Sequence, residues 1–244
     1  MFGVSVIIDI KPILLYTQSI NSANWYAVSE RGEKMSGLFI TLEGTDGAGK
    51  TTQIKLLEKY LKNKGYEVIC TREPGGTDIS EKIRKLIIDP ENIEMTPLTE
   101  ALLYCAARAQ LVKQLIIPAL KNGSIVICDR FVDSSIVYQG IARGMGADMI
   151  AELNKYATGG LVPDITFFLR LDSSAGINRK KKQAKLDRIE QEKESFHRRV
   201  FAGYIELCKK EPERIKAIDA SRSIDDIHNI IISHTEETIK KLSL

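Results

Sequence analysis

The chain alternates between short apolar runs and longer stretches in which apolar residues recur every three or four positions. Five of the short runs predict strands, because each is rich in β-branched or aromatic residues and is bounded by turn-forming residues. The runs are LFITLEG (38–44), YEVICTREPGG (66–76), GSIVICDR (123–130), DITFFLRLD (164–172) and RIKAIDAS (214–221). Their nearly continuous apolar character is typical of strands that are covered on both faces.

Helices are predicted between these strands. The clearest are TTQIKLLEKYLKNKG (51–65), ISEKIRKLIID (79–89), LTEALLYCAARAQLVKQLIIPAL (98–120) and a last helix after Ser223. The third of these is apolar around much of its circumference, which predicts a central position. The alternation of strands and helices predicts an α/β fold with a five-stranded parallel sheet and helices on both faces. We find no repeats or low-complexity linkers, so we expect one domain.

Residues 1–34 match no later part of the pattern, and Met35 stands just before the first predicted strand. The opening segment carries Asp9 and Lys11 inside its apolar stretch, which does not fit a signal peptide. We expect 1–34 to be an extension of unknown role, dispensable or an artefact of start-site choice, and 35–244 to be the functional domain. A chain beginning at Met35 that failed to fold or work would refute this.

Composition and charge limit the classes of partner that the protein is expected to bind. The net charge of +3 is too small to predict nucleic-acid binding by itself, and no run approaches the ~20 apolar residues that cross a bilayer. The four cysteines include no CxxC pair, so we expect reduced thiols in a cytoplasmic protein rather than disulfides or a zinc site.

The first predicted strand runs directly into a phosphate-binding motif, G-x-x-x-x-G-K-[ST]. Its glycines allow several backbone N–H groups to face one anion, and the following helix adds its positive end. The lysine reaches the β- and γ-phosphates, and the threonine hydroxyl can ligate Mg²⁺. The motif predicts a P-loop NTPase fold with ATP bound by Gly44, Thr45, Asp46, Gly47, Ala48, Gly49, Lys50 and Thr51.

The motif alone does not separate kinases from GTPases or motor ATPases. A GTPase should carry Asn-Lys-x-Asp after a late strand, and the NK pairs at Asn63 and Asn154 continue as GY and YA without ending a strand. A small-acceptor kinase should instead carry a second cluster of arginines with an aromatic residue, and a basic lid. The sequence contains candidates for both.

Three motifs are candidates for an acceptor site. TREPGGT (71–77) follows the second strand, at the edge where α/β sheets bind ligands. Tyr104 and Arg108 are four apart on one helix face, where they can stack on a base and hydrogen-bond its edge, although this motif alone favours a core tyrosine with a solvated arginine. Asp129 and Arg130 end a buried strand, where Asp129 can act on Mg²⁺ and Arg130 can bridge two phosphates; a salt bridge is the alternative.

A basic segment precedes the fifth strand. Six of the ten residues from 179 to 188 are basic. This segment can be a solvated helix face or, with weaker support, a nucleic-acid patch. We favour a third interpretation, a lid over 176–195 that closes on ATP and brings positive charge to the transferring phosphoryl group.

Together these motifs resemble the thymidylate kinase family over nearly all of residues 37–244. The resemblance rests on EGTDGAGKTT, TREPGGT, LLYCAAR, DRFVDSS, YQG and LDRIE. It implies a nucleoside monophosphate kinase-like P-loop fold, a homodimer, and the phosphorylation of dTMP to dTDP by ATP and Mg²⁺ in dTTP synthesis. The acceptor is already anionic near neutral pH, so alignment and charge neutralisation should replace a strong general base.

The resemblance also assigns residues. It implies that Tyr104 stacks on thymine, Arg108 addresses its edge, and Asp46 meets the sugar 3′-hydroxyl. The expected substrate-binding set is Arg72 and Arg84 at the acceptor phosphate, Pro74, Tyr104 and Arg108, and Ser134, Ser135, Tyr138 and Gln139 lining the nucleoside pocket. Thr51 and Asp129 are the expected Mg²⁺ ligands, partly through water. The expected catalytic set is Asp46, Lys50, Asp129, Arg130 and Arg188.

The lid assignment departs from the family in one place. Gly47 stands where some members carry a P-loop arginine, so the lid must supply the catalytic charge, as in the bacterial type. Gln183 replaces the arginine that such lids often carry, which leaves Lys181, Lys182 and Arg188, of which we favour Arg188. Arg179 resembles the residue that lies against adenine.

Two alternatives stay open from the sequence. One is a kinase for another acceptor, such as dUMP or a nucleoside, and the other is a regulatory protein that binds ATP without turnover. The intact Lys50, Asp129 and Arg130 disfavour the second. The sequence does not give the degree of discrimination among acceptors or the dimer interface, for which 98–117 is our hypothesis.

Overall fold

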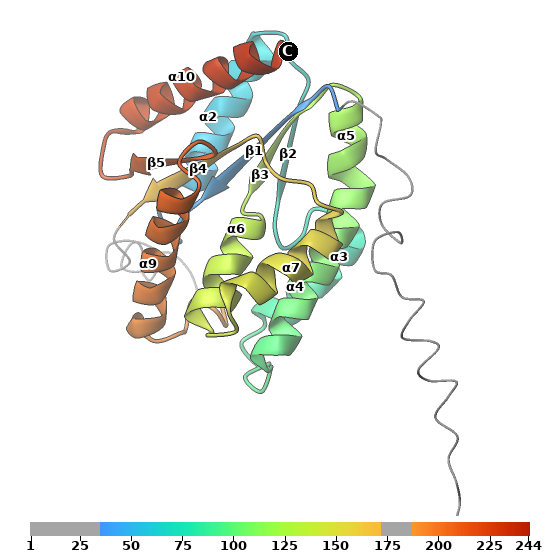
Figure 1. Cartoon of the computed structure of the whole chain (residues 1–244), viewed down its shortest axis with the longest axis vertical. Coiled ribbons are helices and arrows are strands. Elements are labelled where there is room, and N and C mark those ends of the chain that lie inside the picture. Colours follow the sequence, from blue (N-terminus) through green and yellow to red (C-terminus); the bar gives the residue numbers. More distant parts are fainter. Residues whose placement is uncertain (1–34, 172–186) are drawn as a thin grey trace, which may run out of the picture. The chain divides into compact units, whose positions relative to one another are not determined.

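Five parallel strands form one sheet, which confirms the predicted architecture (Figure 1). The computed structural model describes residues 35–171 and 187–244, all within one compact unit. The strand order is β2-β3-β1-β4-β5. The strands are β1 (Leu38–Glu43), β2 (Val68–Arg72), β3 (Ile125–Asp129), β4 (Ile165–Arg170) and β5 (Ile215–Asp219). Residues 1–34, and with them the expected extension, lie outside the described part of the chain.

Helices connect the strands on both sides of the sheet. Those before β3 are α2 (Lys50–Asn63), α3 (Asp78–Ile88), α4 (Pro97–Leu111), the π-helical turn η1 (Val112–Ile116) and α5 (Ile117–Lys121). Those after β3 are α6 (Val132–Ser135), the π-helical segment η2 (Ile136–Ala142), α7 (Ala147–Thr158), α9 (Glu194–Lys210) and α10 (Ile224–Leu242). Within residues 35–171 and 187–244, none of the helices is long and apolar enough to cross a bilayer.

The predicted long helix over 98–120 is three helical pieces in series, α4, η1 and α5. The chain passes from α4 through η1 without leaving helical geometry. Pro118 follows the π-helical turn, in which the Ile117 N–H donates to the Val112 carbonyl, and its missing backbone N–H interrupts the regular helical bonding at this point. The π-helical turn has no recognisable sequence signal, so the pattern of apolar residues alone could not reveal it.

Alternation along the strands divides the core between the two faces of the sheet. Leu38, Ile40 and Leu42 of β1 pack in one cluster with α2 and α10. Phe39 points to the other face and packs with η1 and α5, and Phe168 of β4 packs with η2 and α9. Both faces are therefore covered, as the continuous apolar strands require.

The carboxyl ends of three adjacent strands, β1, β2 and β3, meet at one edge of the sheet. Leu42 of β1 and Arg72 of β2 both pair with Asp129 of β3. The phosphate-binding loop after β1, the TREPGGT loop after β2 and the Asp-Arg pair that ends β3 are thereby gathered in one place. This is the edge at which ligands bind in open α/β sheets.

A buried ion pair ties the second half of the sheet to α6. Arg214 Nη1 and Nη2 donate to Asp133 Oδ2 and Oδ1 at 2.7 and 2.8 Å. Arg214 Nη1 also donates to Thr166 Oγ1, whose hydroxyl shares a 2.7 Å hydrogen bond with Thr41. Asp133 is almost fully buried, so its charge depends on this one guanidinium and these hydroxyls.

The variant Arg214→Leu should lower the free energy of unfolding by about 3–5 kcal/mol, because it leaves the Asp133 carboxylate buried without its cation. Urea unfolding measures the change. Arg198→Leu is the matched control, since Arg198 forms an exposed i,i+4 pair with Glu194 and should cost no more than about 1 kcal/mol. Equal losses in the two variants would contradict the structural role of Arg214.

Candidate active site

The phosphate-binding motif forms a tight loop between β1 and α2. Gly44, Gly47 and Gly49 all have positive φ angles, of 142°, 79° and 95°. A Cβ at Gly44 would lie 2.7 Å from the Leu169 carbonyl oxygen, so a side chain there would collide with β4. No side chain caps the start of α2. Its first N–H groups are therefore available for an anion, as in phosphate sites at helix N-termini.

Lys50 folds back over the loop that precedes it. Its Nζ donates to the carbonyl oxygens of Gly44 and Thr45 at 3.0 and 3.2 Å. Burial lowers the pKa of Lys50, and the charge of Arg130 adds to this, although Asp129 and Asp46 act in the opposite direction. The ammonium group is thus held in a poorly solvated position, where an anion would interact strongly with it.

A cavity of about 480 Å³ opens over this loop. Its lining includes Asp46, Gly47, Gly49, Lys50, Thr51, Asp129 and Arg130, together with Thr52, Arg72, Glu73 and Arg84. Thr45 and Ala48 face elsewhere: Thr45 Oγ1 donates to the Leu171 carbonyl, and Ala48 packs in the core. The structure therefore brings the loop residues together with the Asp-Arg pair that ends β3, and we call this space the phosphate cavity.

Asp129 has one unsatisfied oxygen in the phosphate cavity. Its Oδ1 is buried and has no hydrogen-bond partner among the residues described. Buried carboxylate oxygens are normally paired, so this atom indicates a missing donor or cation. Thr51 lies in the first turn of α2 and lines the same cavity.

Arg130 lines the phosphate cavity and has an unusual backbone conformation. Its φ angle is 70°, which is uncommon for a residue other than glycine, and such conformations cluster at functional sites. The Nη2 group donates to Asp46 at 3.1 Å, the Nη1 group donates to Ser134 Oγ at 3.2 Å, and the guanidinium lies 5.3 Å from the Tyr138 ring centre. The loop backbone and these partners together fix where the charge lies.

A buried cluster behind Arg130 was missed by the sequence analysis. Glu43 Oε1 accepts from the Phe131 N–H at 2.8 Å, and Oε2 accepts from Ser134 Oγ at 2.6 Å and from the Tyr204 hydroxyl at 2.7 Å. Burial raises the pKa of Glu43, and the charge of Asp133 adds to this. A glutamate in an otherwise apolar buried strand was the available signal, because such residues are rarely buried without a purpose.

A second cavity, of about 100 Å³, lies beside the first. Its lining contains the predicted residues Asp46, Pro74, Arg84, Tyr104, Arg108, Arg130, Ser134, Tyr138 and Gln139. It also contains five residues that the sequence analysis did not select: Glu73, Ile88, Asp187, Ile189 and Glu190. We call this space the acceptor cavity.

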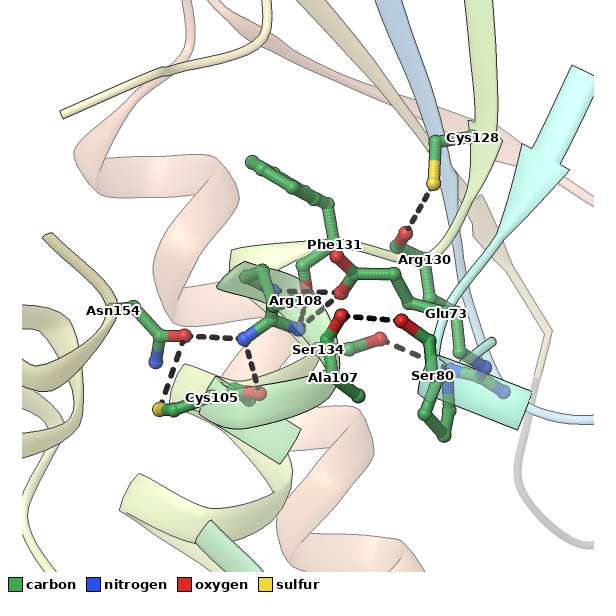
Figure 2. Close-up of polar contacts among 12 residues, drawn as sticks. Glu73, Ser80, Cys105, Ala107, Arg108, Cys128, Arg130, Phe131, Ser134 and Asn154 are labelled. Atoms are coloured by element: carbon green, nitrogen blue, oxygen red, sulfur yellow. Dashed lines mark hydrogen bonds and ion pairs between the residues drawn. The ribbon is translucent and has the colours of Figure 1, made fainter. Parts of the chain in front are cut away.

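Arg108 is the most heavily engaged residue of the acceptor cavity, and Figure 2 shows Glu73 and Asn154 on opposite sides of its guanidinium. Its Nε donates to Glu73 at 2.7 Å and its Nη2 pairs with the same carboxylate. Nη1 donates to Ser135 Oγ at 3.0 Å and to Asn154 Oδ1, and Nη2 donates to the Phe131 carbonyl at 3.0 Å. Four of the five guanidinium N–H groups donate hydrogen bonds in these contacts, and the fifth, on Nη2, belongs to the ion pair with Glu73.

These contacts affect the expectation that Arg108 hydrogen-bonds the edge of a base. In this structure the guanidinium has no spare N–H, so that role requires one protein partner to be released. Ser135 lies beneath Arg108 and does not line the cavity, which differs from its expected place in the nucleoside pocket. Burial raises the pKa of Glu73 to about 7, although the charge of Arg108 opposes the shift.

The two arginines expected at the acceptor phosphate occupy different places. Arg84 Nη1 donates to the Pro74 carbonyl at 3.0 Å, and Arg84 lines both cavities. Arg72 lines the phosphate cavity alone, where its Nη1 and Nη2 bond Glu81 at 2.9 and 3.1 Å. Arg84 is thus the better placed of the two for a group that lies between the cavities.

Only part of the predicted lid over 176–195 lies among the described residues. Arg179, Lys181, Lys182 and Gln183 lie outside the described residues. Arg188 is described, and its Nε donates to the Ile87 carbonyl at 2.8 Å while its Nη2 bonds Glu100 at 2.6 Å. It is buried and lines neither cavity. Its catalytic role finds no support in this geometry and stays an untested prediction.

The chain is similar to known proteins over most of its length. A family model described as thymidylate kinase matches residues 42–231. A thymidylate kinase from an Exiguobacterium species is 49% identical over 207 residues, covering 85% of this chain and 98% of that protein. One from Caldanaerobacter subterraneus is 47% identical over 206 residues, covering 84% and 98%. The crystal structure of thymidylate kinase from Ehrlichia chaffeensis matches with a TM-score of 0.68 and 35% identity, covering 82% of this chain and 99% of that one.

Proposed function

Because the chain belongs to the thymidylate kinase family, we infer that it transfers the γ-phosphoryl group of ATP to dTMP, and so makes dTDP for dTTP synthesis. One observation carries the assignment of its two cavities. Asp46, Glu73, Arg84 and Arg130 line both of them, so two ligands would meet end to end at these four residues. We propose that the phosphate cavity binds ATP and that the acceptor cavity binds dTMP.

The reaction needs little from the protein beyond alignment and charge. A phosphate oxygen of dTMP forms a bond to the γ-phosphorus of ATP, the bond from that phosphorus to the β–γ bridging oxygen breaks, and ADP leaves. A phosphate monoester carries a charge of about −1.5 to −2 near pH 7, so no strong base has to remove a proton. Lys50 at the loop and Arg130 at the junction supply the positive charge that offsets repulsion between the two nucleotides.

Asp129 and Thr51 fit a Mg²⁺ ion in the phosphate cavity. The unpartnered buried oxygen of Asp129 is a hard oxygen ligand, and the Thr51 hydroxyl belongs to the same lining. We propose that these two residues hold Mg²⁺, directly or through water, with the phosphates of ATP as further ligands. When bound, the ion would neutralise charge on the β- and γ-phosphate oxygens.

A coupled assay of ADP release tests the function and separates its alternatives. We expect turnover with ATP, Mg²⁺ and dTMP, and loss of turnover when a chelator removes the metal. The same assay with dUMP, UMP, CMP and thymidine distinguishes acceptors. Turnover with thymidine but not dTMP would identify a nucleoside kinase. ATP binding without ADP release for any acceptor would identify a regulatory protein.

Replacing Tyr104 by alanine should raise the KM for dTMP by about 10- to 100-fold, because stacking on a base contributes about 1–3 kcal/mol. The KM for ATP should change little, since Tyr104 lines only the acceptor cavity. Tyr156→Ala is the control, because Tyr156 is half exposed on α7 and lines neither cavity. An unchanged KM for dTMP in Tyr104→Ala would remove the stacking role.

The assembly and location complete the proposal. Leu98 and Leu102, one turn apart on α4, are 47% and 48% exposed, which favours a homodimer through this helix. The four cysteines all lie in the described part of the chain as free thiols, which favours a reducing cytoplasmic location. A monomeric mass by light scattering at micromolar concentration would contradict the homodimer. Recovery of the protein in the periplasmic fraction would contradict the cytoplasmic location.

A further inference from the structure

Glu100 is a buried carboxylate on α4, one helical turn before Tyr104, and it lines neither cavity. It accepts hydrogen bonds from three side chains. Its Oε1 accepts from Gln139 Nε2 at 2.9 Å and from Arg143 Nε at 3.2 Å. Its Oε2 accepts from Arg143 Nη2 at 3.0 Å and from Arg188 Nη2 at 2.6 Å. Of these partners, only Gln139 lines the acceptor cavity.

These partners keep Glu100 ionised. Burial alone would raise its pKa, but the hydrogen bonds from Arg143, Gln139 and Arg188, together with the charge of Arg143, outweigh burial and lower the pKa. An ionised carboxylate can only accept hydrogen bonds. The group that faces Glu100 from Gln139 must therefore be the NH₂ end of its amide.

This requirement also determines the direction in which the Gln139 Oε1 atom points. With Nε2 bound to Glu100, Oε1 is turned away from the carboxylate, and it accepts no hydrogen bond from the described residues. Nearby Arg108 has all of its N–H groups engaged by protein partners. At Gln139 the acceptor cavity consequently offers the Oε1 acceptor to a ligand, while Glu100 occupies one of the two Nε2 N–H groups.

Pyrimidines differ in whether the pairing edge of the ring needs an acceptor or a donor from the protein. Thymine carries an N–H donor at N3, whereas N3 of cytosine is an acceptor. We propose that Glu100 is a specificity-determining positioning residue, which selects pyrimidines with an N3–H by holding the Gln139 amide in one orientation. The proposal rests on the proposed function, namely that the acceptor cavity holds a pyrimidine nucleotide.

The substitution Glu100→Gln tests the proposal because it changes one atom and reverses a hydrogen bond. Oε2 accepts from two guanidinium groups and Oε1 from one, so we expect the new amide to keep its oxygen at the Oε2 position and to place its NH₂ group at the Oε1 position. That group faces Gln139 and can only donate to it. The Gln139 amide should then turn over and present its own NH₂ end to the cavity.

The expected readout is a ratio of specificities. We compare kcat/KM for dTMP with kcat/KM for 5-methyl-dCMP, which keeps the methyl group and differs only at N3 and C4. In Glu100→Gln the ratio should shift toward 5-methyl-dCMP by about 100-fold or more, because a site built for one hydrogen-bonding partner strongly rejects the reversed one. The values for dTMP and dUMP should fall in parallel, and the KM for ATP should stay unchanged.

A purely structural role for Glu100 predicts a different result, in which activity with dTMP and 5-methyl-dCMP falls equally and the ratio does not move. That result would overturn the proposal. Turnover of dTMP by the unmodified enzyme tests the underlying function separately. If Glu100→Gln does not fold, Gln139→Asn replaces it. This variant leaves Glu100, Arg143 and Arg188 in place and shortens the side chain, so its amide no longer reaches the carboxylate. Loss of discrimination in Gln139→Asn would support the proposal, and wild-type discrimination would overturn it.

Discussion

Lys50→Met should reduce kcat by about 10³-fold or more, since a single donor aimed at the charge that develops in a transition state is commonly responsible for 10²–10³ and a phosphoryl-transfer cation for 10³–10⁵. The ammonium group lies at the phosphate-binding loop, where among the described residues it donates hydrogen bonds to two backbone carbonyls. An incoming phosphate can therefore capture it without breaking an ion pair. Steady-state ADP release with saturating dTMP and ATP measures the loss.

The same variant should stay folded. Because burial lowers the pKa of Lys50, the native structure disfavours its charged form, and an apolar side chain of similar length removes that cost. We expect an unchanged or higher Tm. Lys55→Met, on the exposed side of α2, should alter neither Tm nor kcat. Near-normal turnover in Lys50→Met would contradict the assignment of the phosphate cavity to ATP.

Arg130→Met should lower kcat by about 10³-fold, a loss similar to that of removing an arginine that stabilises a transferring phosphoryl group. Arg130 lines both cavities and touches Asp46 across their junction, so its charge lies where the donor and acceptor phosphates would approach each other. We expect the effect mainly in kcat, because repulsion between the two nucleotides is greatest when they are closest.

Arg130→Lys separates charge from geometry. It keeps a cation but loses the planar group that bonds Asp46 and Ser134 at once, so we expect a smaller loss of about 10²-fold. Arg222→Met, at an exposed position before α10, is the control. A reduction in Arg130→Met no larger than in Arg222→Met would show that the junction charge does not act in the reaction.

The sequence predicted the sheet and the loops at its edge because both are local features. Each strand is a continuous apolar run, and the phosphate-binding loop lies between a strand and a helix in the sequence itself. Parallel pairing then brings Leu42, Arg72 and Asp129 into register without further information. The joint lining of the phosphate cavity by the loop and by Asp129 and Arg130 follows from this register.

The missed features depend on contacts between residues far apart in the chain. Glu43 and Tyr204 are 161 positions apart, and no local pattern indicates that they bond. Arg188 belongs to a basic run that suggested phosphate contact, yet Glu100, 88 positions earlier, holds its guanidinium. Charge composition identifies a cation but does not identify its partner. The π-helical segment that carries Tyr138 and Gln139 likewise has no sequence signature.

The fully engaged guanidinium of Arg108 has a consequence for inhibitor design. A compound that places a carbonyl against this residue gains one hydrogen bond only by displacing Glu73, Ser135, Asn154 or the Phe131 carbonyl, so the exchange adds little affinity. We therefore expect inhibitors to gain more affinity from rings placed against Tyr104 than from polar groups placed against Arg108.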